Sequence, residues 1–327
     1  MMKDFFIEDV AQFENSTITS YFVLTSMQIR DKKQGGQYLA LIVSDKTGSL
    51  EARMWDDVAD PIATCSEGAY VKVQGDVSKY QGKFQITLKK LRLAADSEVD
   101  PTDFQPASKF DVGEMWSELR GYVNAFCNAD LKRLVFSFLD DAEIGPAFQA
   151  APAAKRLHHA WLGGLLEHVL TLVRVCLAAA PFYPEVDPDL LVTGAILHDI
   201  GKVRELDWKS SFSYTLEGQM IGHISIAQGM LREKVQEIAP FPERLTMLVE
   251  HMILSHHGKY EFGSPKLPMT PEAIFLSALD DLEAKMQALR NEFAAAQAAG
   301  KRPGEVTEWV RSMERSLFNS KKYLEEE

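Results

Sequence analysis

The chain of 327 residues is long enough for two domains, and its hydrophobic content of 46% is enough to fill ordinary cores. A net charge of −12 argues against indiscriminate binding to polyanions. The acidic residues near the N-terminus give a charge pattern that differs from that of a secretory signal or transit peptide. No uninterrupted apolar run approaches the length of a membrane span, and three well-separated cysteines fit neither a disulfide framework nor a zinc ribbon, so we expect a cytoplasmic protein with no membrane partner.

Residues 17–93 carry the pattern of five short strands. Residues 18–30 are rich in β-branched and aromatic side chains, and Gly35-Gly36 is a turn signal before the apolar run 38–43. Further strand-like runs, separated by the turn sequences Asp45-Lys46-Thr47-Gly48 and Tyr80-Gln81-Gly82-Lys83, lie at 49–55, 70–75 and 84–88. Five strands at such intervals predict a small closed all-β barrel.

These strands resemble an OB-fold nucleic-acid-binding domain in their order, in the Asp-x-Thr-Gly turn, in the Trp55 that follows and in the Val-x-Val-x-Gly strand. Residues 16–95 hold 11 lysines and arginines against 8 acidic residues, a local positive excess in an acidic chain. OB barrels stack bases on exposed aromatic rings and follow the backbone of a single strand with lysines. The resemblance implies nucleic-acid contacts at Tyr38, Trp55, Tyr80, Phe84, Lys32, Lys33, Arg53, Lys79 and Lys83. Each aromatic can instead belong to the barrel core, and each lysine can be solvated.

The pattern changes from strands to helices after residue 111. Residues 96–111 are acidic, contain two prolines and are expected to link a barrel domain at 1–95 to an all-α domain at 112–290. Apolar residues at three- and four-residue spacings predict helices at 112–140, 162–180, 189–200, 217–235, 241–254 and 271–298. A C-terminal extension, 291–327, is expected to end in a helix at 305–327. Its apolar stripe either packs on its own domain or joins copies of the chain, and consists of Trp309, Val310, Met313, Leu317 and Phe318.

All the histidines lie in the helical part of the chain, and they are His158, His159, His168, His198, His223, His251, His256 and His257. One histidine on an apolar helix face is usually a core residue with a satisfied hydrogen bond. Several histidines on successive helices favour metal coordination instead.

The stretch 194–202 places His198 and Asp199 side by side at the end of an apolar run. Neighbours on a helix diverge by about 100°, so the pair can give two ligands to one ion or extend toward a second ion. Gly201 is expected to end the helix, and Lys202, one turn after His198, can project into the same space. A hydrogen-bonded structural pair is the alternative for His198 and Asp199.

His168, the His198-Asp199 pair and the distant Asp280 resemble the pattern of the HD superfamily of metal-dependent phosphohydrolases. The resemblance implies that these side chains are metal ligands, with Asp199 at the catalytic centre. His223 and His256 match the two extra histidines of members that hold two ions, in which the paired aspartate bridges the ions.

Other positions near this pattern have roles that stay open. Lys202 matches a lysine that often contacts a substrate phosphate in the superfamily. His257 can replace His256 as a ligand, and Asp281 can replace Asp280. His158 and His159 lie just outside the pattern, where they either contact a phosphate or lie on the surface, and His159 is also a possible metal ligand. His251 is expected to be structural.

Mixed imidazole and carboxylate ligands suit divalent transition metals such as manganese, cobalt, iron, zinc or nickel better than calcium. Two ions about 3.5–4 Å apart can clamp a phosphodiester and lower the pKa of a bridging water. No covalent nucleophile is then needed, and the sequence has neither a Gly-x-Ser-x-Gly elbow nor a Gly-rich phosphate-binding loop.

An OB-like barrel followed by an HD-like helical domain narrows the resemblance to the YhaM-type 3′-5′ exoribonucleases. Four motifs carry it, at residues 163–168, 194–202, 222–224 and 254–258. The resemblance implies removal of nucleotides from the 3′ end of single-stranded RNA, with DNA as a second substrate, usually with manganese or cobalt. Three alternatives stay open, namely a phosphohydrolase of small or cyclic nucleotides, a non-catalytic nucleic-acid-binding scaffold and a di-iron oxygenase.

Overall fold

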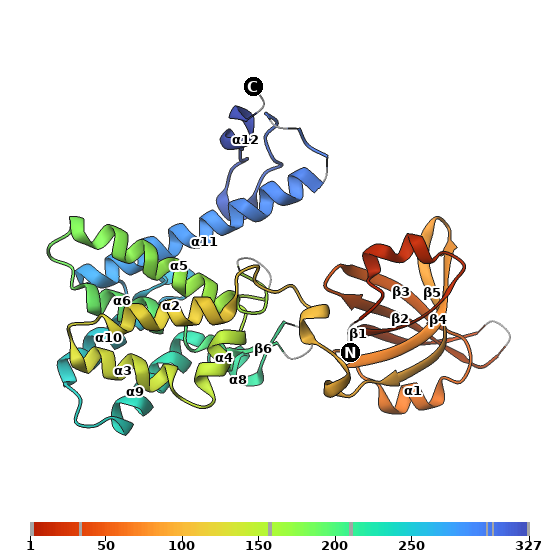
Figure 1. Cartoon of the computed structure of the whole chain (residues 1–327), viewed down its shortest axis with the longest axis horizontal. Coiled ribbons are helices and arrows are strands. Elements are labelled where there is room, and N and C mark those ends of the chain that lie inside the picture. The colour runs from red at the N-terminus through yellow and green to blue at the C-terminus, as the bar shows by residue number, and fades with distance from the viewer. Residues whose placement is uncertain are drawn as a thin grey trace. The chain divides into compact units, whose positions relative to one another are not determined.

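The computed structural model describes residues 3–32, 35–155, 159–208, 212–298, 300–302 and 304–325 (Figure 1). The chain divides into two compact units. The first holds the residues up to Ala107 together with 207–213, and the second holds Ser108–Leu206 and the residues from Tyr214 onward.

The first unit is a closed barrel, as the strand pattern predicts. Its strands are β1 (Thr17–Asp31), β2 (Gln37–Asp45), β3 (Gly48–Met54), β4 (Tyr70–Tyr80) and β5 (Lys83–Leu93). The strands follow the order β1-β2-β3-β5-β4, in which β3 and β5 pair in parallel and the other neighbours pair antiparallel. This unit also contains the helices η1 (Ile7–Phe13) and α1 (Ala59–Thr64). The expected OB-type barrel is therefore confirmed.

A buried carboxylate holds the turn between β2 and β3. Asp45 accepts hydrogen bonds from the backbone N–H of Thr47 at 2.9 Å and of Ile7 at 3.0 Å. Its Oδ2 atom lies 2.6 Å from the Lys3 ammonium, and the two side chains are at most 2% exposed. Because loss of one partner would leave a buried charge uncompensated, this end of the barrel depends on Asp45.

Most of the expected linker at 96–111 packs on the barrel instead. Residues up to 107 belong to the barrel unit and form the short helices η2 (Asp96–Glu98) and η3 (Pro101–Asp103). Phe104 is buried against Tyr70, with their ring centroids 4.9 Å apart. Acidic residues and prolines are typical of linkers, but here an aromatic ring docks the segment on the core.

The second unit is a bundle of helices (Figure 1). Its longer helices are α2 (Val112–Asn124), α3 (Ala129–Leu139), α5 (Gly164–Ala179), α6 (Pro188–Leu197), α9 (His223–Glu237), α10 (Glu243–Ser255) and α11 (Pro271–Ala298). Its shorter elements are α4 (Ile144–Ala150), η4 (Ala180–Phe182), α7 (Lys202–Glu205), α8 (Leu216–Met220) and η5 (Tyr260–Phe262). Two-residue strands β6 (Leu206–Asp207) and β7 (Ser213–Tyr214) pair with each other. Helix α5 packs against α2, α4, α6 and α11, so it lies at the centre of the bundle.

One helical stretch, Gly164–Phe182, is long and apolar enough to cross a membrane by length and composition alone. The expectation concerned uninterrupted apolar runs, and charged side chains interrupt this stretch. Half of the stretch is buried inside the helical unit, and it also carries the charged Glu167 and Arg174. Such burial is typical of the core helix of a globular domain.

Two of the predicted helices are each divided in the structure. The stretch 112–140 forms α2 and α3, because the Asn128 side chain accepts hydrogen bonds from two backbone N–H groups at 3.1 Å and so starts a new helix. The stretch 217–235 forms α8 and α9, which are separated where Gly222 takes a φ of 79°. Apolar periodicity runs across both breaks, so the pattern did not reveal them.

The expected helix at 305–327 is wrong for the residues that the structure describes there. Only η6 (Arg311–Met313) and α12 (Ser320–Leu324) are helical. The Thr307 hydroxyl accepts a hydrogen bond from the Leu317 N–H at 2.9 Å, and the Thr307 N–H donates to the Leu317 carbonyl at 2.9 Å. Such bonds compete with helical ones.

The apolar stripe expected on that helix is partly buried and partly exposed. Val310 and Leu317 are buried, whereas Trp309 is 66% exposed and Phe318 is 43% exposed. Figure 1 shows the end of α11 and this C-terminal segment projecting from the bundle. Association between copies of the chain through this segment stays a prediction.

Candidate metal centre

Close packing of α9 brings distant parts of the sequence together. Gly201 was expected to end a helix, but α6 already ends at Leu197, and Gly201 has a right-handed helical backbone with φ −61° just before α7. A Cβ atom at this position would lie 2.0 Å from the His223 carbonyl oxygen. Glycine is therefore needed for close approach rather than for a helix stop. The contact places the His198-Asp199 end of α6 beside the start of α9, where His223 lies.

One oxygen of Asp199 faces a first group of ligand-type side chains. Asp199 Oδ2 lies 3.3 Å from His198 Nε2 and 3.7 Å from His168 Nε2. Asp280, on α11, lies opposite, with its Oδ1 3.3 Å from His168 Nε2 and 3.8 Å from His198 Nε2. Ligands that share an ion at bond lengths of about 2.0–2.2 Å are themselves about 3–3.6 Å apart. The four side chains are therefore close to the spacing of one coordination sphere.

The other oxygen of Asp199 faces a second group. Asp199 Oδ1 lies 3.4 Å from His223 Nε2 and 3.7 Å from His256 Nε2. Both nitrogens are buried and have no hydrogen-bond partner among the described residues. A buried polar atom of this kind is costly unless an ion or a water satisfies it. Asp199 thus lies between two groups of imidazoles, as a bridging carboxylate would.

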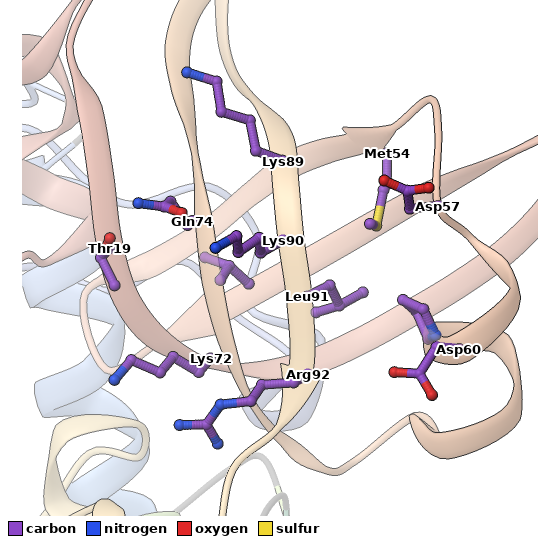
Figure 2. Close-up of a pocket in the computed structure, with 12 residues that line it drawn as sticks. Thr19, Met54, Asp57, Asp60, Lys72, Gln74, Lys89, Lys90, Leu91 and Arg92 are labelled. Atoms are coloured by element: carbon purple, nitrogen blue, oxygen red, sulfur yellow. The ribbon is translucent and has the colours of Figure 1, made fainter.

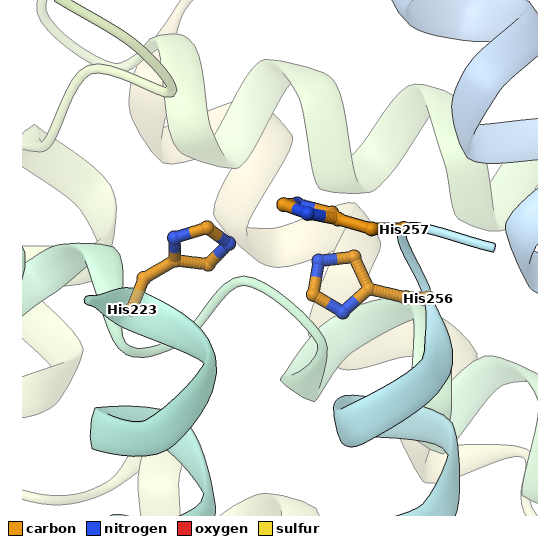
Figure 3. A group of neighbouring side chains, drawn as sticks. All are labelled: His223, His256 and His257. Carbon is orange, nitrogen blue, oxygen red and sulfur yellow. The ribbon is translucent and has the colours of Figure 1, made fainter. Parts of the chain in front are cut away.

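His257 belongs to the second group together with His256. Figure 3 shows the rings of His223, His256 and His257 turned toward a shared space, and their ligand atoms lie within 4.8 Å of one another. The ring centroids of His256 and His257 are 4.4 Å apart. The sequence presented these two histidines as alternatives, but the structure places both within reach of the same point.

Backbone carbonyls orient two of the imidazoles. The Nδ1 atoms of His198 and His256 lie 2.9 Å and 2.7 Å from the carbonyl oxygen three residues earlier. Because a carbonyl oxygen only accepts, each Nδ1 donates, and in the neutral ring the lone pair is on Nε2. Both Nε2 atoms face the Asp199 carboxylate, where an ion would lie.

Carboxylates that the sequence analysis did not select orient two other imidazoles. His168 Nδ1 lies 2.7 Å from Glu283 Oε2, and His223 Nδ1 lies 3.2 Å from Glu205 Oε1. Partners of this kind fix the orientation of metal-binding histidines. For Glu283 the sequence offered a signal, because Glu283 follows Asp280 by three residues and so lies on the same face of α11.

His159 lies behind His168 rather than at the surface. It is 1% exposed, and its Nε2 lies 2.7 Å from Glu283 Oε1. Glu283 therefore connects the two histidines, and a direct contact of His159 with a phosphate is not supported. His158 lies outside the described residues. His251 accepts a hydrogen bond from the Met269 N–H at 2.9 Å, in line with a structural role.

Asp281 pairs with a lysine outside both groups. Its carboxylate is 55% exposed and lies 2.5 Å from the Lys285 ammonium. Asp280, by contrast, contacts the first group, so the geometry favours it over its neighbour.

Opposing charges stabilise the ionised forms in this centre. Burial raises the pKa of Asp199, but interactions with Lys202 and His198 outweigh burial and hold the pKa well below its usual range. Lys202 Nζ lies 2.5 Å from Asp199 Oδ2, and this pairing raises the pKa of Lys202 although burial lowers it. Burial likewise lowers the pKa of His168, but hydrogen bonds to Asp280 and Glu283 raise it to about 10. The carboxylates therefore favour positive charge at this point.

One aromatic pair and one cation–ring pair lie on the outer face of the barrel, where nucleic-acid contacts are predicted. Tyr38 and Trp55 stack with ring centroids 4.5 Å apart and an interplanar angle of 23°. The Arg53 guanidinium lies 5.5 Å from the ring centroid of Tyr80, which is 53% exposed. Exposed rings beside a cation are suited to stacking with bases.

Phe84 and Lys79 lie on the other side of the sheet from Tyr80. Phe84 is partly buried and packs against the barrel core, with the Lys79 ammonium 4.5 Å from its ring centroid. Lys79 also pairs with Glu14 at 3.1 Å. Side chains alternate along a strand, so Tyr80 and Lys83, which pair in register, face the opposite way. The structure thus gives Phe84 a core role instead of a stacking role.

The two lysines predicted to contact nucleic acid in the first hairpin receive little support from the structure. Lys32 lies 2.9 Å from Asp56, and Lys33 lies outside the described residues. Figure 2 shows a separate cavity of about 580 Å³ on the barrel, lined by Lys89, Lys90 and Arg92 on β5, by Lys72 on β4, and by Asp57 and Asp60. Lys89 pairs with Asp76 and Arg92 with Glu98. Acidic groups therefore accompany its cations and weaken its attraction for a phosphate backbone.

Comparison with known proteins relates both units to established families. Residues 165–285 match the HD domain, and residues 24–94 match the OB-fold nucleic acid binding domain. The chain is 36% identical to the 3′-5′ exoribonuclease YhaM of Geobacillus sp. (strain WCH70), over 91% of this chain and 90% of that protein. It is 35% identical to YhaM of Bacillus subtilis (strain 168), over 92% of this chain and 94% of that protein. The chain belongs to the YhaM 3′-5′ exoribonuclease family.

The side chains at the centre of this YhaM-family chain fit divalent metal ions. HD-domain hydrolases depend on metals, and the centre offers imidazole nitrogens and carboxylate oxygens in clusters of ligand spacing. The buried Nε2 atoms of His223 and His256 have no hydrogen-bond partner in the described part of the chain, and an ion that binds beside Asp199 would satisfy them.

Proposed function

We propose that this YhaM-family chain is a metal-dependent 3′-5′ exoribonuclease that hydrolyses single-stranded RNA. One observation carries the proposal, which is that the two oxygens of Asp199 face two separate groups of imidazoles at 3.3–3.7 Å. Centres with two ions serve phosphodiester hydrolysis. Relatives named 3′-5′ exoribonuclease, at 36% and 35% identity, support the polarity and the substrate.

The proposed centre holds two ions that share Asp199. His168, His198 and Asp280 would complete the first site, and His223, His256 and His257 would complete the second. Manganese is favoured, while cobalt, iron, zinc and nickel suit the same donors. When bound, the ions would polarise the scissile phosphate and lower the pKa of the attacking water.

Lys202 is proposed to contact the substrate phosphate. Its ammonium is 2.5 Å from Asp199, and its side chain remains 12% exposed. The raised pKa keeps it positively charged at neutral pH. A fixed positive charge at this point attracts phosphate oxygens and stabilises negative charge that develops during hydrolysis.

The barrel is proposed to hold the single strand through the exposed aromatic rings of its outer face. Tyr38, Trp55 and Tyr80 offer ring faces, and Arg53 offers a cation beside Tyr80. Stacking does not depend on base identity or on the sugar, so DNA is a second substrate to test.

The test is incubation of the purified chain with manganese on single-stranded RNA and DNA that carry a 5′ label. We expect a ladder of products shortened from the 3′ end, which a chelator prevents. Asp199→Ala should remove this activity, whereas Asp140→Ala, which changes an aspartate that is 58% exposed and remote in sequence from the motifs, should keep it. Hydrolysis confined to mononucleotides or cyclic nucleotides would contradict the proposal.

A further inference from the structure

A recess in the helical unit adjoins the metal centre. It has a volume of about 500 Å³ and is lined by His257, Phe262, Ile274, Ser277, Lys285 and Met313, among others. One wall is a face of α11, another is the turn that contains η5, and Ser312 and Met313 contribute from the C-terminal segment. Its size lies within the range of about 300–1,000 Å³ that is typical of small-molecule sites. Because His257 also belongs to the second histidine group, the recess adjoins the place where a scissile phosphate would bind.

Phe262 presents an aromatic ring to this recess. It is 56% exposed, so it contributes little to the core of the bundle. The Lys259 ammonium lies 5.2 Å from its ring centroid. An accessible ring with a neighbouring cation is a platform on which a base can stack.

The same turn also orients a histidine of the centre. The Phe262 carbonyl oxygen accepts a hydrogen bond from His257 Nδ1 at 2.8 Å. The backbone of one residue thus positions an imidazole of the metal centre, while its side chain lines the recess. A nucleotide that has its phosphate at the centre can place its base against this ring.

The remaining lining residues suit a nucleoside. Ile274 and Met313 offer apolar contacts to the flat faces of a base, and Ser277 and Lys285 offer hydrogen-bond donors to its polar edges or to the ribose. Lys285 pairs with Asp281, which also lines the recess, but the side chains are 53% and 55% exposed. Exposed pairs of this kind are weak, so the ammonium can turn toward a ligand.

We propose that this recess binds the 3′-terminal nucleotide of the RNA strand, with its base stacked on Phe262. The inference rests on the proposed exoribonuclease function and adds where the residue to be released lies. The released nucleoside 5′-monophosphate should therefore also bind in the recess, with its base in the same place.

The first experiment compares RNA oligonucleotides that end in adenosine or in an abasic residue, with the full-length chain and manganese. We expect the KM for the adenosine end to be about tenfold lower, because stacking on an aromatic side chain contributes appreciably for each base. Phe262→Ala should lose this preference, and Phe262→Trp should restore it. Tyr260→Ala is the matched control, since Tyr260 lies on the same turn, is 64% exposed and does not line the recess. A Phe262→Ala variant that keeps the preference would overturn the proposal.

The second experiment does not depend on turnover. Calorimetry with adenosine 5′-monophosphate and manganese should show binding to the unchanged chain and about tenfold weaker binding to Phe262→Ala. Equal affinity for both proteins, or no binding, would refute the proposal that the nucleotide binds in the recess. Absence of RNA hydrolysis by the unchanged chain would instead count against the proposed function, so the two failures are distinguishable.

Discussion

The metal centre and the outer face of the barrel place functional side chains in opposite surroundings. Asp199 is 4% exposed and lies among charged and ligand-type groups, whereas Tyr80 is 53% exposed and has a neighbouring guanidinium. Charges interact strongly where water is excluded, and a buried group that loses its partner is costly. Rings on a surface act more independently. Substitutions should therefore have large, cooperative effects in the centre and small, separable effects on the barrel face.

The largest effect is expected at the shared carboxylate. Asp199→Asn removes one negative charge from between the two histidine groups, and we expect the hydrolysis rate to fall by about 10²–10³-fold or more. Manganese should raise the melting temperature of the unchanged chain but not of this variant, because ligand binding stabilises the folded state. Retention of both activity and the manganese shift would show that Asp199 bridges nothing.

A buried charge in the barrel should behave like the metal centre rather than like the barrel face. Asp45→Ala leaves the Lys3 ammonium buried without its partner, and we expect the free energy of unfolding to fall by about 3–5 kcal/mol. Urea unfolding followed by tryptophan fluorescence measures this. Asp56→Ala, at a carboxylate that is 85% exposed, should change it by less than about 1 kcal/mol. Similar effects of the two substitutions would break the contrast between buried and exposed charge.

Substitution of Glu283 should have an intermediate effect, because Glu283 contacts His168 but belongs to neither group of ligand-type side chains around Asp199. Glu283→Gln weakens the hydrogen bond that orients His168, so metal affinity should fall by about 10–100-fold. Calorimetric titration with manganese measures the change. Glu233→Gln, at a side chain that is 60% exposed, is the control and should leave the affinity unchanged.

The smallest effects are expected on the barrel face, where Tyr80 and Phe84 form a matched comparison. Tyr80→Ala should raise the KM for single-stranded RNA by about five- to tenfold with kcat unchanged, because one stacking contact is lost. Phe84→Ala should instead lower the melting temperature with little change in KM, since Phe84 packs against the barrel core. The reverse result would place the nucleic-acid surface on the opposite side of the sheet.

The sequence predicted the features that depend on a local pattern or on a motif. Several histidines on successive helices indicated a metal centre, and the resemblance to the HD superfamily added Asp280 to the expected ligands. Strand alternation also predicted the barrel. It did not separate Tyr80 from Phe84, because both are aromatic and the side that each faces depends on the pairing register of β4 and β5.

Strand and helix patterns in the sequence thus determined the two folds, and the motifs that resemble the HD superfamily gave the candidate ligands. Only the tertiary structure decided that His256 and His257 lie in the same group, that Glu283 and Glu205 orient imidazoles, and that 96–107 packs on the barrel. The physical reason is that these relations depend on contacts between segments far apart in the chain. The approach of Gly201 to His223 is an example, because neither residue carries a local signal of the other.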